Sequence, residues 1–319
     1  MESIIEILNK IDDSKIVSAI IASISAIVTT LIIKPFIDRK FHVFKLNQEY
    51  KSEQRKQIKN TLAKNKVHLL KCAEELNYRL WNFTINHKEG WLDVKGDYKM
   101  LSYYFHSFTY LILNFYYWIK ITEKQLIYLD TTVSSKEDLD LIKYFRLFES
   151  IFCSIALFDG YEYDKSKTTD HFFKGQLDSL SSVLIRDDKT LSYTEYESKY
   201  SDFEKDILQL YLYLDCLTPD EKRLRFFRLV LLHYSLIAFL NSYGYDYQYT
   251  SKLKIKGLTT KLRYKDVNII NNYQNTIYGF KLHKSKGMKS ILNILGIRKY
   301  LISSLFQSKN NISQKTMKR

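Results

Sequence analysis

The first feature of the hydrophobic pattern is an uncharged run close to the N-terminus. Residues 16–33 (IVSAIIASISAIVTTLII) carry no charged side chain, and Lys15 and Lys34 flank the run. At about 1.5 Å per residue, a helix of this length rises roughly 27 Å, which is close to the thickness of the hydrocarbon core of a bilayer. Ile and Val fall on every face of such a helix, so no polar face is left for water. We therefore expect a single transmembrane helix over residues 16–37, after a short leader at residues 1–15.

Two other interpretations of this run are a buried core helix and a cleaved secretory signal. A secretory signal has basic residues before its apolar run and a small-residue cleavage site after it. In this chain the leader holds four acidic residues against two lysines, and Lys34, Pro35 and Phe36 follow the run. The pattern therefore favours an anchor that is not cleaved.

Basic side chains are concentrated on the C-terminal side of the run, at Lys34, Arg39, Lys40, Lys45, Lys51, Arg55 and Lys56. Segments rich in Lys and Arg stay on the cytoplasmic side of a membrane, so we expect the leader outside and the bulk of the chain in the cytoplasm, at the inner (cell) membrane. The cysteines agree with that compartment, because Cys72, Cys153 and Cys216 are odd in number, far apart and without metal-ligand spacing.

Small side chains recur at four-residue steps within the predicted span. They are Ser18, Ala22, Ala26 and Thr30. Such spacing lets two transmembrane helices approach each other closely in lipid. We expect these four residues to permit a homodimer through the span.

Beyond the span, the pattern predicts a mostly helical chain. Residues 38–66 are polar and charged, which is typical of a juxtamembrane helix or a solvated stalk. With only 9 Gly and 2 Pro, the chain lacks the turn residues of many-stranded folds. We expect an all-α protein with a cytoplasmic helical bundle over residues 67–250. Apolar positions with a helical period predict helices over about 69–83, 98–120, 136–158, 170–185 and 192–217, although the last could begin as a strand.

Two helix starts are marked by capping residues. Ser135 and Asp138 precede the apolar positions of the predicted helix 136–158. Thr218, Pro219 and Glu221 form a capping-box pattern, which predicts that a further helix begins there and extends to about residue 242.

The net charge of the chain is confined to its C-terminal part. Residues 251–319 hold sixteen Lys and Arg and one acid, Asp266, whereas the net charge of the whole chain is +14. We expect this segment to be basic and amphipathic, with a helix over 291–306 that lies on the anionic inner leaflet. The alternatives are nucleic acid, which Lys-rich segments bind through phosphates, and a solvated tail without a partner. The residues expected to contact headgroups or phosphate are Lys281, Lys284, Lys286, Lys289, Arg298 and Lys299.

Common catalytic and cofactor motifs are missing from the sequence. It contains no Gly-x-Gly-x-x-Gly, no phosphate loop, no His-Glu-x-x-His and no Gly-x-Ser-x-Gly. One pair, Arg228 and His233, fits the Arg-x4-6-His spacing of the HEPN ribonucleases, in which Arg holds a phosphate and His moves a proton. Against this, positions five apart on a helix point roughly 140° apart, and Leu229 stands where that family favours a polar residue.

The stretch Leu69, Leu70, Ala73, Leu76, Arg79, Leu80 and Asn82 resembles the first helix after the membrane in a loose bacterial family of single-pass proteins of uncharacterised function. The aromatic stretch 98–118 and the trio Phe172, Gly175 and Gln176 are similar to that family too, although Leu177 stands where its members often have Arg. The resemblance implies a short N-terminal span before a helical cytoplasmic domain and no particular activity.

The residues themselves allow two interpretations of Arg79 and Gln176. Arg79 is a paired or surface arginine and Gln176 is a polar group at a helix start, or both line a small polar pocket. Taken together, the sequence predicts a membrane-tethered interaction, scaffold or sensor protein without a cofactor. Its expected partners are the bilayer, anionic headgroups and another protein. The alternative function is a membrane-anchored HEPN-like ribonuclease or nucleic-acid-binding defence effector.

Overall fold

The structure is a computed structural model, which describes residues 13–99, 102–162, 166, 170–186, 189–220, 223–260 and 267–296. The chain divides into two compact units, Met1–Gln57 and Ile58–Arg319. Its described elements are almost all helical, which confirms the all-α prediction; the exception is a two-residue ladder in which Ile185 pairs with Thr190.

The first unit contains the predicted span. Helix α2 (Asp13–Val28) passes through a π-helical turn, η1 (Thr29–Ile33), into α3 (Lys34–Asn86), which belongs in part to each unit. Pro35 explains the interruption, because its nitrogen has no hydrogen to donate and its ring occupies the space beside the carbonyl of Leu31. The polar stretch 38–66 lies wholly within α3 and is therefore helical, which was one of the two alternatives drawn from the sequence.

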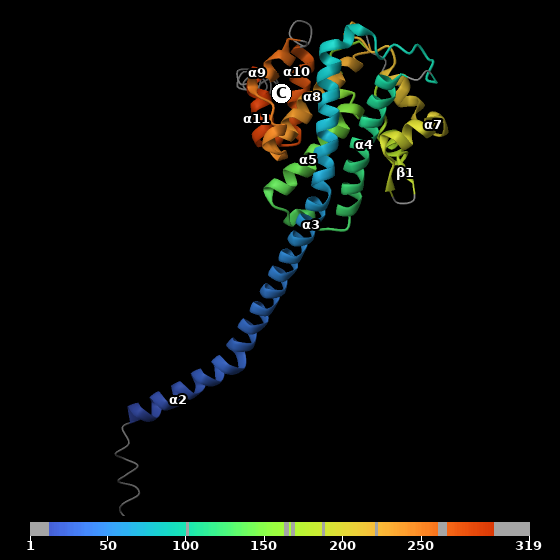
Figure 1. Cartoon of the computed structure of the whole chain (residues 1–319). Helices are drawn as coiled ribbons and strands as arrows, with labels where there is room; N and C mark the ends of the chain where they lie inside the picture. Colours follow the sequence, from blue (N-terminus) through green and yellow to red (C-terminus); the bar gives the residue numbers. More distant parts are fainter. Residues whose placement is uncertain are drawn as a thin grey trace, which may run out of the picture. The chain divides into compact units, whose positions relative to one another are not determined.

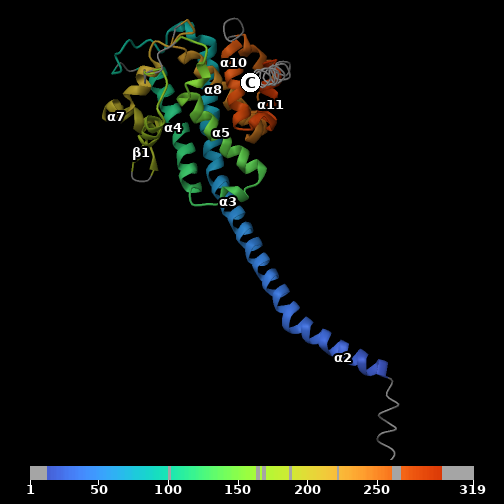
Figure 2. The same cartoon turned by 180° about the vertical axis from the view of Figure 1, so that it is seen from behind.

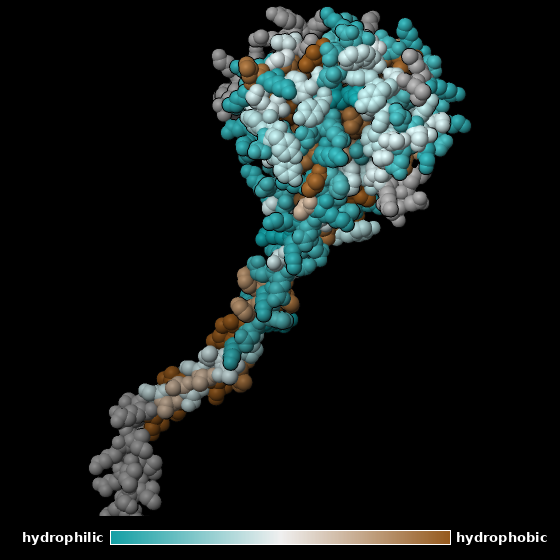
Figure 3. Space-filling view, viewed as in Figure 1, coloured by the Kyte–Doolittle hydropathy of each residue, from teal (hydrophilic) through white to brown (hydrophobic). Residues whose placement is uncertain are grey.

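Apolar side chains of the first unit are uncovered (Figure 3). Ile21, Leu31 and Ile32 are more than half exposed. Two hydroxyl groups, in contrast, bond within the helix: Ser23 Oγ donates to Ala19 O at 2.8 Å and Thr30 Oγ1 donates to Ala26 O at 2.7 Å. The surface of this segment is therefore largely apolar and exposed.

The second unit contains the C-terminal part of α3 and the helices that follow it in the chain. In this unit, α3, α4 and α5 run side by side (Figures 1 and 2). The longer helices are α4 (Tyr103–Leu126), α5 (Lys136–Cys153), α6 (Lys174–Ser182), α7 (Tyr193–Leu214), α8 (Arg225–Tyr243), α9 (Lys252–Thr259), α10 (Val267–Gly279) and α11 (Lys286–Ile294). The short elements are η2 (His87–Glu89), η3 (Thr131–Val133), η4 (Ala156–Phe158), η5 (Asp246–Gln248), η6 (Leu282–Lys284), β1 (Ile185–Arg186) and β2 (Lys189–Thr190).

Helix α8 lies at the centre of this unit. Nearly all of its side chains are buried, and it packs against α5 and α11. It is long and apolar enough to cross a bilayer, as is the helix that includes the uncharged run, but its residues are covered by the rest of the unit. Helix α8 is therefore a core helix, because its apolar surface is already removed from water.

Ion pairs join α4 to α5 and α6. Lys120 Nζ of α4 lies 3.3 Å from Glu149 of α5 and 2.7 Å from Asp178 of α6, and Glu149 also pairs with Lys174 at 3.1 Å. Lys120 and Glu149 are partly buried, whereas Asp178 and Lys174 are exposed, and the four charges complement one another across α4, α5 and α6.

Capping residues set the starts of several helices. Ser135 Oγ accepts from Asp138 N at 3.1 Å, as predicted, and Ser192 and Glu195 form a reciprocal capping box that makes 193–214 helical from its first residue. The predicted start at Thr218 is wrong, because the helix begins only at Arg225. Thr218 instead accepts from Asp220 N at 3.3 Å in a turn.

Arg225 explains the late start of α8. Its Nη1 donates to the carbonyl oxygens of Leu212, Tyr213 and Asp215 at 2.8, 2.6 and 3.1 Å, where α7 ends. A buried arginine that satisfies the last carbonyls of one helix fixes where the next one can begin. The connection then closes through Leu224, whose φ of 59° lies in the left-handed region.

The first part of the basic C-terminal segment is packed into the second unit. Helix α11 packs closely on α8, since a Cβ at Gly287 would lie 1.9 Å from Ala238 O. Ile291 and Leu292 are buried in the core, which corrects the prediction that this apolar face enters the lipid. The predicted boundary after residue 250 therefore falls inside a compact unit, and residues 297–306 of the predicted amphipathic helix lie outside the described residues.

Candidate functional site

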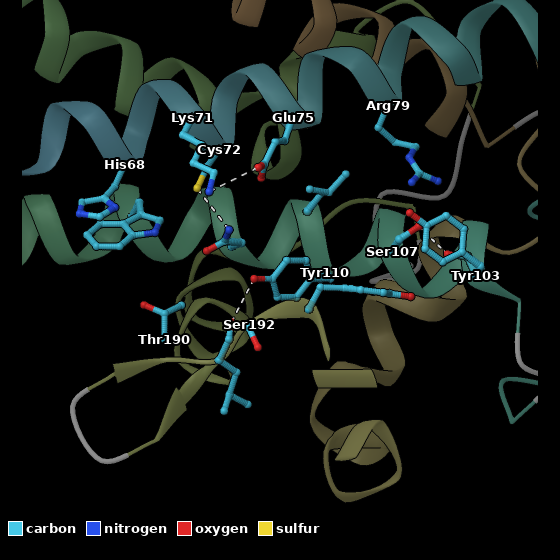
Figure 4. Close-up of a pocket in the computed structure, with 15 residues that line it drawn as sticks. His68, Lys71, Cys72, Glu75, Arg79, Tyr103, Ser107, Tyr110, Thr190 and Ser192 are labelled. Atoms are coloured by element: carbon cyan, nitrogen blue, oxygen red, sulfur yellow. Dashed lines mark hydrogen bonds and ion pairs between the residues drawn. The ribbon is translucent and has the colours of Figure 1, made fainter. Parts of the chain in front are cut away.

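A cleft of about 520 Å³ lies between α3 and α4 and is closed on a third side by the end of β2 and the start of α7 (Figure 4). A shallower depression beside it shares Glu75, Arg79, Tyr103 and Leu111. The cleft is lined by His68, Lys71, Cys72, Glu75, Arg79, Tyr103, Ser107, Tyr110, Leu111, Asn114, Trp118, Thr190, Leu191, Ser192 and Tyr193.

Helix α3 contributes a row of polar side chains to the cleft. His68, Lys71, Glu75 and Arg79 follow one another at steps of three or four residues, so they share one face of the helix. Lys71 Nζ lies 4.0 Å from Glu75 Oε1. Arg79 Nη1 donates to Tyr104 O at 3.2 Å, and its guanidinium lies 4.3 Å from the centre of the Tyr104 ring. The row therefore alternates positive, negative and positive charge along the cleft.

Helix α4 and the segment 190–193 contribute aromatic rings. His68 stacks on Trp118, with ring centres 4.1 Å apart and an angle of 4° between the planes. Tyr193 meets Tyr103 and Tyr110 edge to face, at 5.8 and 5.5 Å. Tyr110 also donates its hydroxyl to Leu191 O at 3.0 Å, which ties α4 to the third side of the cleft. Flat apolar faces thus surround the charged row.

Burial shifts the pKa of two titratable groups of the cleft, Cys72 and Glu75. Burial raises the pKa of the Cys72 thiol to about 12, and Asn114 Nδ2 donates to its sulfur at 3.2 Å. Such a thiol stays protonated and unreactive at neutral pH. Burial also raises the pKa of Glu75, an effect that Lys71 partly opposes. The cleft is therefore suited to binding and not to attack by a cysteine nucleophile.

Metal ligation has no support in the part of the chain that the structure describes, where no group of three His, Cys, Asp or Glu side chains could hold an ion. Nor does any hydrogen bond join His68 to Cys72 among the described residues, although the two lie one turn apart.

The predicted ribonuclease pair lies in the core. Arg228 is fully buried, and its Nη1 donates to the carbonyl oxygens of Ile151 and Ser154 at 2.7 and 2.9 Å, where α5 ends. His233 is fully buried as well and meets the Trp81 ring edge to face at 4.5 Å. Neither side chain reaches a surface on which RNA could bind, so the structure does not bring this pair together as a site.

The other predicted residues are distributed between the two units. Ser18, Ala22, Ala26 and Thr30 are exposed on α2 and η1. Lys281, Lys284, Lys286 and Lys289 are exposed around η6 and α11, whereas Arg298 and Lys299 lie outside the described residues.

Arg79 and Gln176 take different roles in the structure. Arg79 lines the cleft. Gln176 is a polar group at a helix start, because its Oε1 accepts from Phe173 N at 3.1 Å and from Gln209 Nε2 at 3.0 Å. The aromatic walls of the cleft were not predicted, since Tyr110, Trp118 and Tyr193 look like ordinary core residues in the sequence.

Comparison of the chain with protein-family models, with curated proteins and with solved structures found no match.

Proposed function

We propose that this chain is a membrane-anchored binding protein of the sensor or scaffold kind. Its uncharged N-terminal helix spans the bilayer, and the cleft beside α3 receives the ligand that the protein senses or presents. The observation that carries the proposal is an apolar window of 18 residues near the N-terminus, none of which is buried in the protein. An apolar surface of that length has no other partner among the described residues of the chain.

The energetics support insertion of this helix. Residues 16–33 contain ten Ile, Val and Leu side chains and no charge. On the scale of membrane insertion, each such side chain favours the bilayer by about 0.3–0.6 kcal/mol, so together they favour it by about 3–6 kcal/mol. The basic residues that follow support an orientation with the larger unit in the cytoplasm, at the inner membrane.

A matched pair of variants tests the anchor. We expect the full chain to stay in the membrane fraction after alkaline carbonate treatment. Ile24→Asp combined with Ile27→Asp is expected to release it, because each acid at the centre of a span costs about 2.5–3.5 kcal/mol. The control, Ile24→Leu with Ile27→Leu, should be retained like the parent. Release of the unmodified chain by carbonate would contradict the proposal.

The lining of the cleft supports a flat, polar ligand that carries negative charge. Tyr103, Tyr110 and Tyr193 offer ring faces and edges for stacking. Glu75 accepts hydrogen bonds only, as a carboxylate does, and so matches a ring with adjacent N–H groups. Lys71 and Arg79, which lie on either side of Glu75, attract an anionic substituent of such a ring. A purine nucleotide with a guanine base has all three features.

Guanosine monophosphate is the probe for this cleft. We expect it to raise the melting temperature of the full chain in detergent, and ribose 5-phosphate, which lacks the ring, to do so far less. Glu75→Ala is expected to weaken the binding of the nucleotide at least tenfold, because a charged acceptor is lost. Lys64→Gln, on an exposed part of α3 outside the cleft, is the control. Equal effects of the two substitutions would count against the cleft as the binding site.

A further inference from the structure

A second cavity lies at the C-terminal end of the described chain, between α10, η6 and α11. Its volume is about 290 Å³, and it shares no residue with the cleft beside α3. That volume lies just below the range of about 300–1,000 Å³ for small-molecule sites and is enough for a phosphate group with a small substituent. The cavity is lined by Gln274, Tyr278, His283, Lys284, Lys289, Leu292 and Asn293.

Two lysines give this cavity uncompensated positive charge. Lys284 and Lys289 are exposed at its edge, and residues 267–296 contain no Asp or Glu. Within the described residues, neither lysine has a carboxylate partner within 4 Å. Lysine ammonium groups bind phosphate as point charges, and two of them on one cavity match a dianion.

The cavity also holds an imidazole and two side-chain amides. His283 stacks on Tyr278, with ring centres 4.4 Å apart, and its buried Nδ1 has no hydrogen-bond partner in the described structure. Buried polar atoms normally have a partner, so an unpaired one at a cavity points to a missing ligand group. The side-chain amides of Gln274 and Asn293 add neutral donors to the same wall.

Two lysines, Lys284 and Lys143, act on the charge of His283. Burial lowers the pKa of His283, and Lys284 and then Lys143 of α5 lower it further. Lys143 is the only one of these lysines with an acidic partner, Asp140 at 2.7 Å, among the residues that the structure describes. The same cations that make the imidazole harder to protonate would stabilise a bound anion.

We propose that this cavity binds a phosphate monoester, with Lys284 and Lys289 as the charged contacts and His283, Gln274 and Asn293 completing the site. The inference does not depend on the membrane anchor or on the cleft beside α3. The same chemistry is offered by two sources, the headgroup of phosphatidic acid and a soluble phosphate ester, and glycerol 3-phosphate represents both.

The experiment uses the full chain in nanodiscs of neutral phosphatidylcholine. Glycerol 3-phosphate is titrated at constant ionic strength, and the pKa of His283 is followed by NMR, with His283→Gln to assign its signal. We expect saturable binding and a rise of the His283 pKa on saturation, because the bound dianion stabilises the imidazolium. Lys284→Gln combined with Lys289→Gln is expected to weaken binding at least tenfold.

The matched control is Lys281→Gln with Lys286→Gln, which removes two exposed lysines of the same segment that do not line the cavity. We expect this control to weaken binding less than about threefold, since exposed charges act only through screened attraction. Equal weakening by both double variants, or the absence of saturable binding, would overturn the proposal.

Nanodiscs that contain phosphatidic acid identify the source of the ligand. Displacement of glycerol 3-phosphate by this lipid, lost in the Lys284→Gln, Lys289→Gln variant, would support the proposal with a headgroup as the ligand. If the affinity for glycerol 3-phosphate were unchanged in these nanodiscs, the proposal would be supported and the ligand would be a soluble phosphate ester.

Discussion

The contact of α11 with α8 can be tested at one glycine. An ideal Cβ on residue 287 would lie 1.9 Å from Ala238 O and 2.7 Å from Ser242 Oγ. Carbon and oxygen atoms normally approach no closer than about 3.3 Å, so Gly287→Ala must move α11 by about 1.4 Å or displace the backbone of α8. Gly287 N also donates to Ser242 Oγ at 3.0 Å, and that hydrogen bond would be strained.

These effects set the expected magnitude. Overpacking of a tight contact costs about 1–3 kcal/mol and a lost hydrogen bond about 1 kcal/mol, offset by about 0.5–1 kcal/mol from the better helix propensity of Ala. We expect Gly287→Ala to destabilise the second unit by about 1–3.5 kcal/mol, which corresponds to a fall in melting temperature of roughly 2–14 °C.

The assay is thermal unfolding of the full chain in detergent, followed by near-ultraviolet circular dichroism. Gly257→Ala is the control, because Gly257 lies within α9 and a Cβ there would meet no atom within 4 Å. We expect that control to be as stable as the parent or slightly more so. If Gly287→Ala were as stable as Gly257→Ala, α11 would not pack on α8 as described, and its apolar face would be free to enter a lipid surface.

Three further predictions concern single features of the chain. Iodoacetamide at pH 8 should modify exposed Cys216 long before Cys72, whose pKa of about 12 leaves only about one thiolate in 10⁴; equal rates in the folded protein would contradict this burial. Burial, with a smaller effect of Lys254, lowers the pKa of His233 to about 3, so the unfolded chain takes up a proton below about pH 6.5 that the folded chain does not. The free energy of unfolding in urea should therefore fall by about 2 kcal/mol between pH 7 and pH 5 because of this group, and His233→Leu should remove that fall. If His233→Leu left the pH dependence of the unfolding free energy unchanged, His233 would be accessible to protons in the folded chain. Ala22→Leu with Ala26→Leu should abolish cross-linking of two chains in membranes, whereas Ile20→Leu with Ile24→Leu on the opposite face should not; unchanged cross-linking would exclude this face as the dimer contact.

Much of the fold follows from local patterns in the sequence. The helical period predicts the existence of α4, α5 and α7, and the serines at residues 135 and 192 cap their helices as such residues do elsewhere. These features depend on residues within one or two turns of one another, so a single sequence contains the information needed to predict them.

The features that were mispredicted depend on contacts between distant residues. Helix α8 begins at Arg225 and not near Thr218, because the guanidinium satisfies carbonyls at the end of α7. The basic segment looked like a lipid-facing helix, because the sequence pattern of α11 is amphipathic whether its apolar face meets lipid or α8. The burial of Ile291 and Leu292 and the close approach at Gly287 distinguish the two.

The cleft, too, has features that follow from local sequence and features that depend on contacts between distant residues. That Arg79 lines a polar pocket was among the alternatives drawn from the sequence, since an arginine on an otherwise apolar helix needs a polar environment. The stack of His68 on Trp118 joins residues fifty positions apart on two helices. No spacing rule within either helix predicts which residues of its neighbour it will face, so the aromatic walls required the tertiary structure.

The central claim, that the uncharged N-terminal helix lies in a bilayer, is tested most directly by the accessibility of a single thiol. The variant Ile24→Cys places a thiol at the middle of the span, and Gln48→Cys places one on an exposed position of α3 beyond it. In native membrane vesicles we predict that a water-soluble maleimide labels the second thiol and leaves the first unlabelled until detergent is added. Equal labelling of both thiols in intact vesicles would contradict the membrane span.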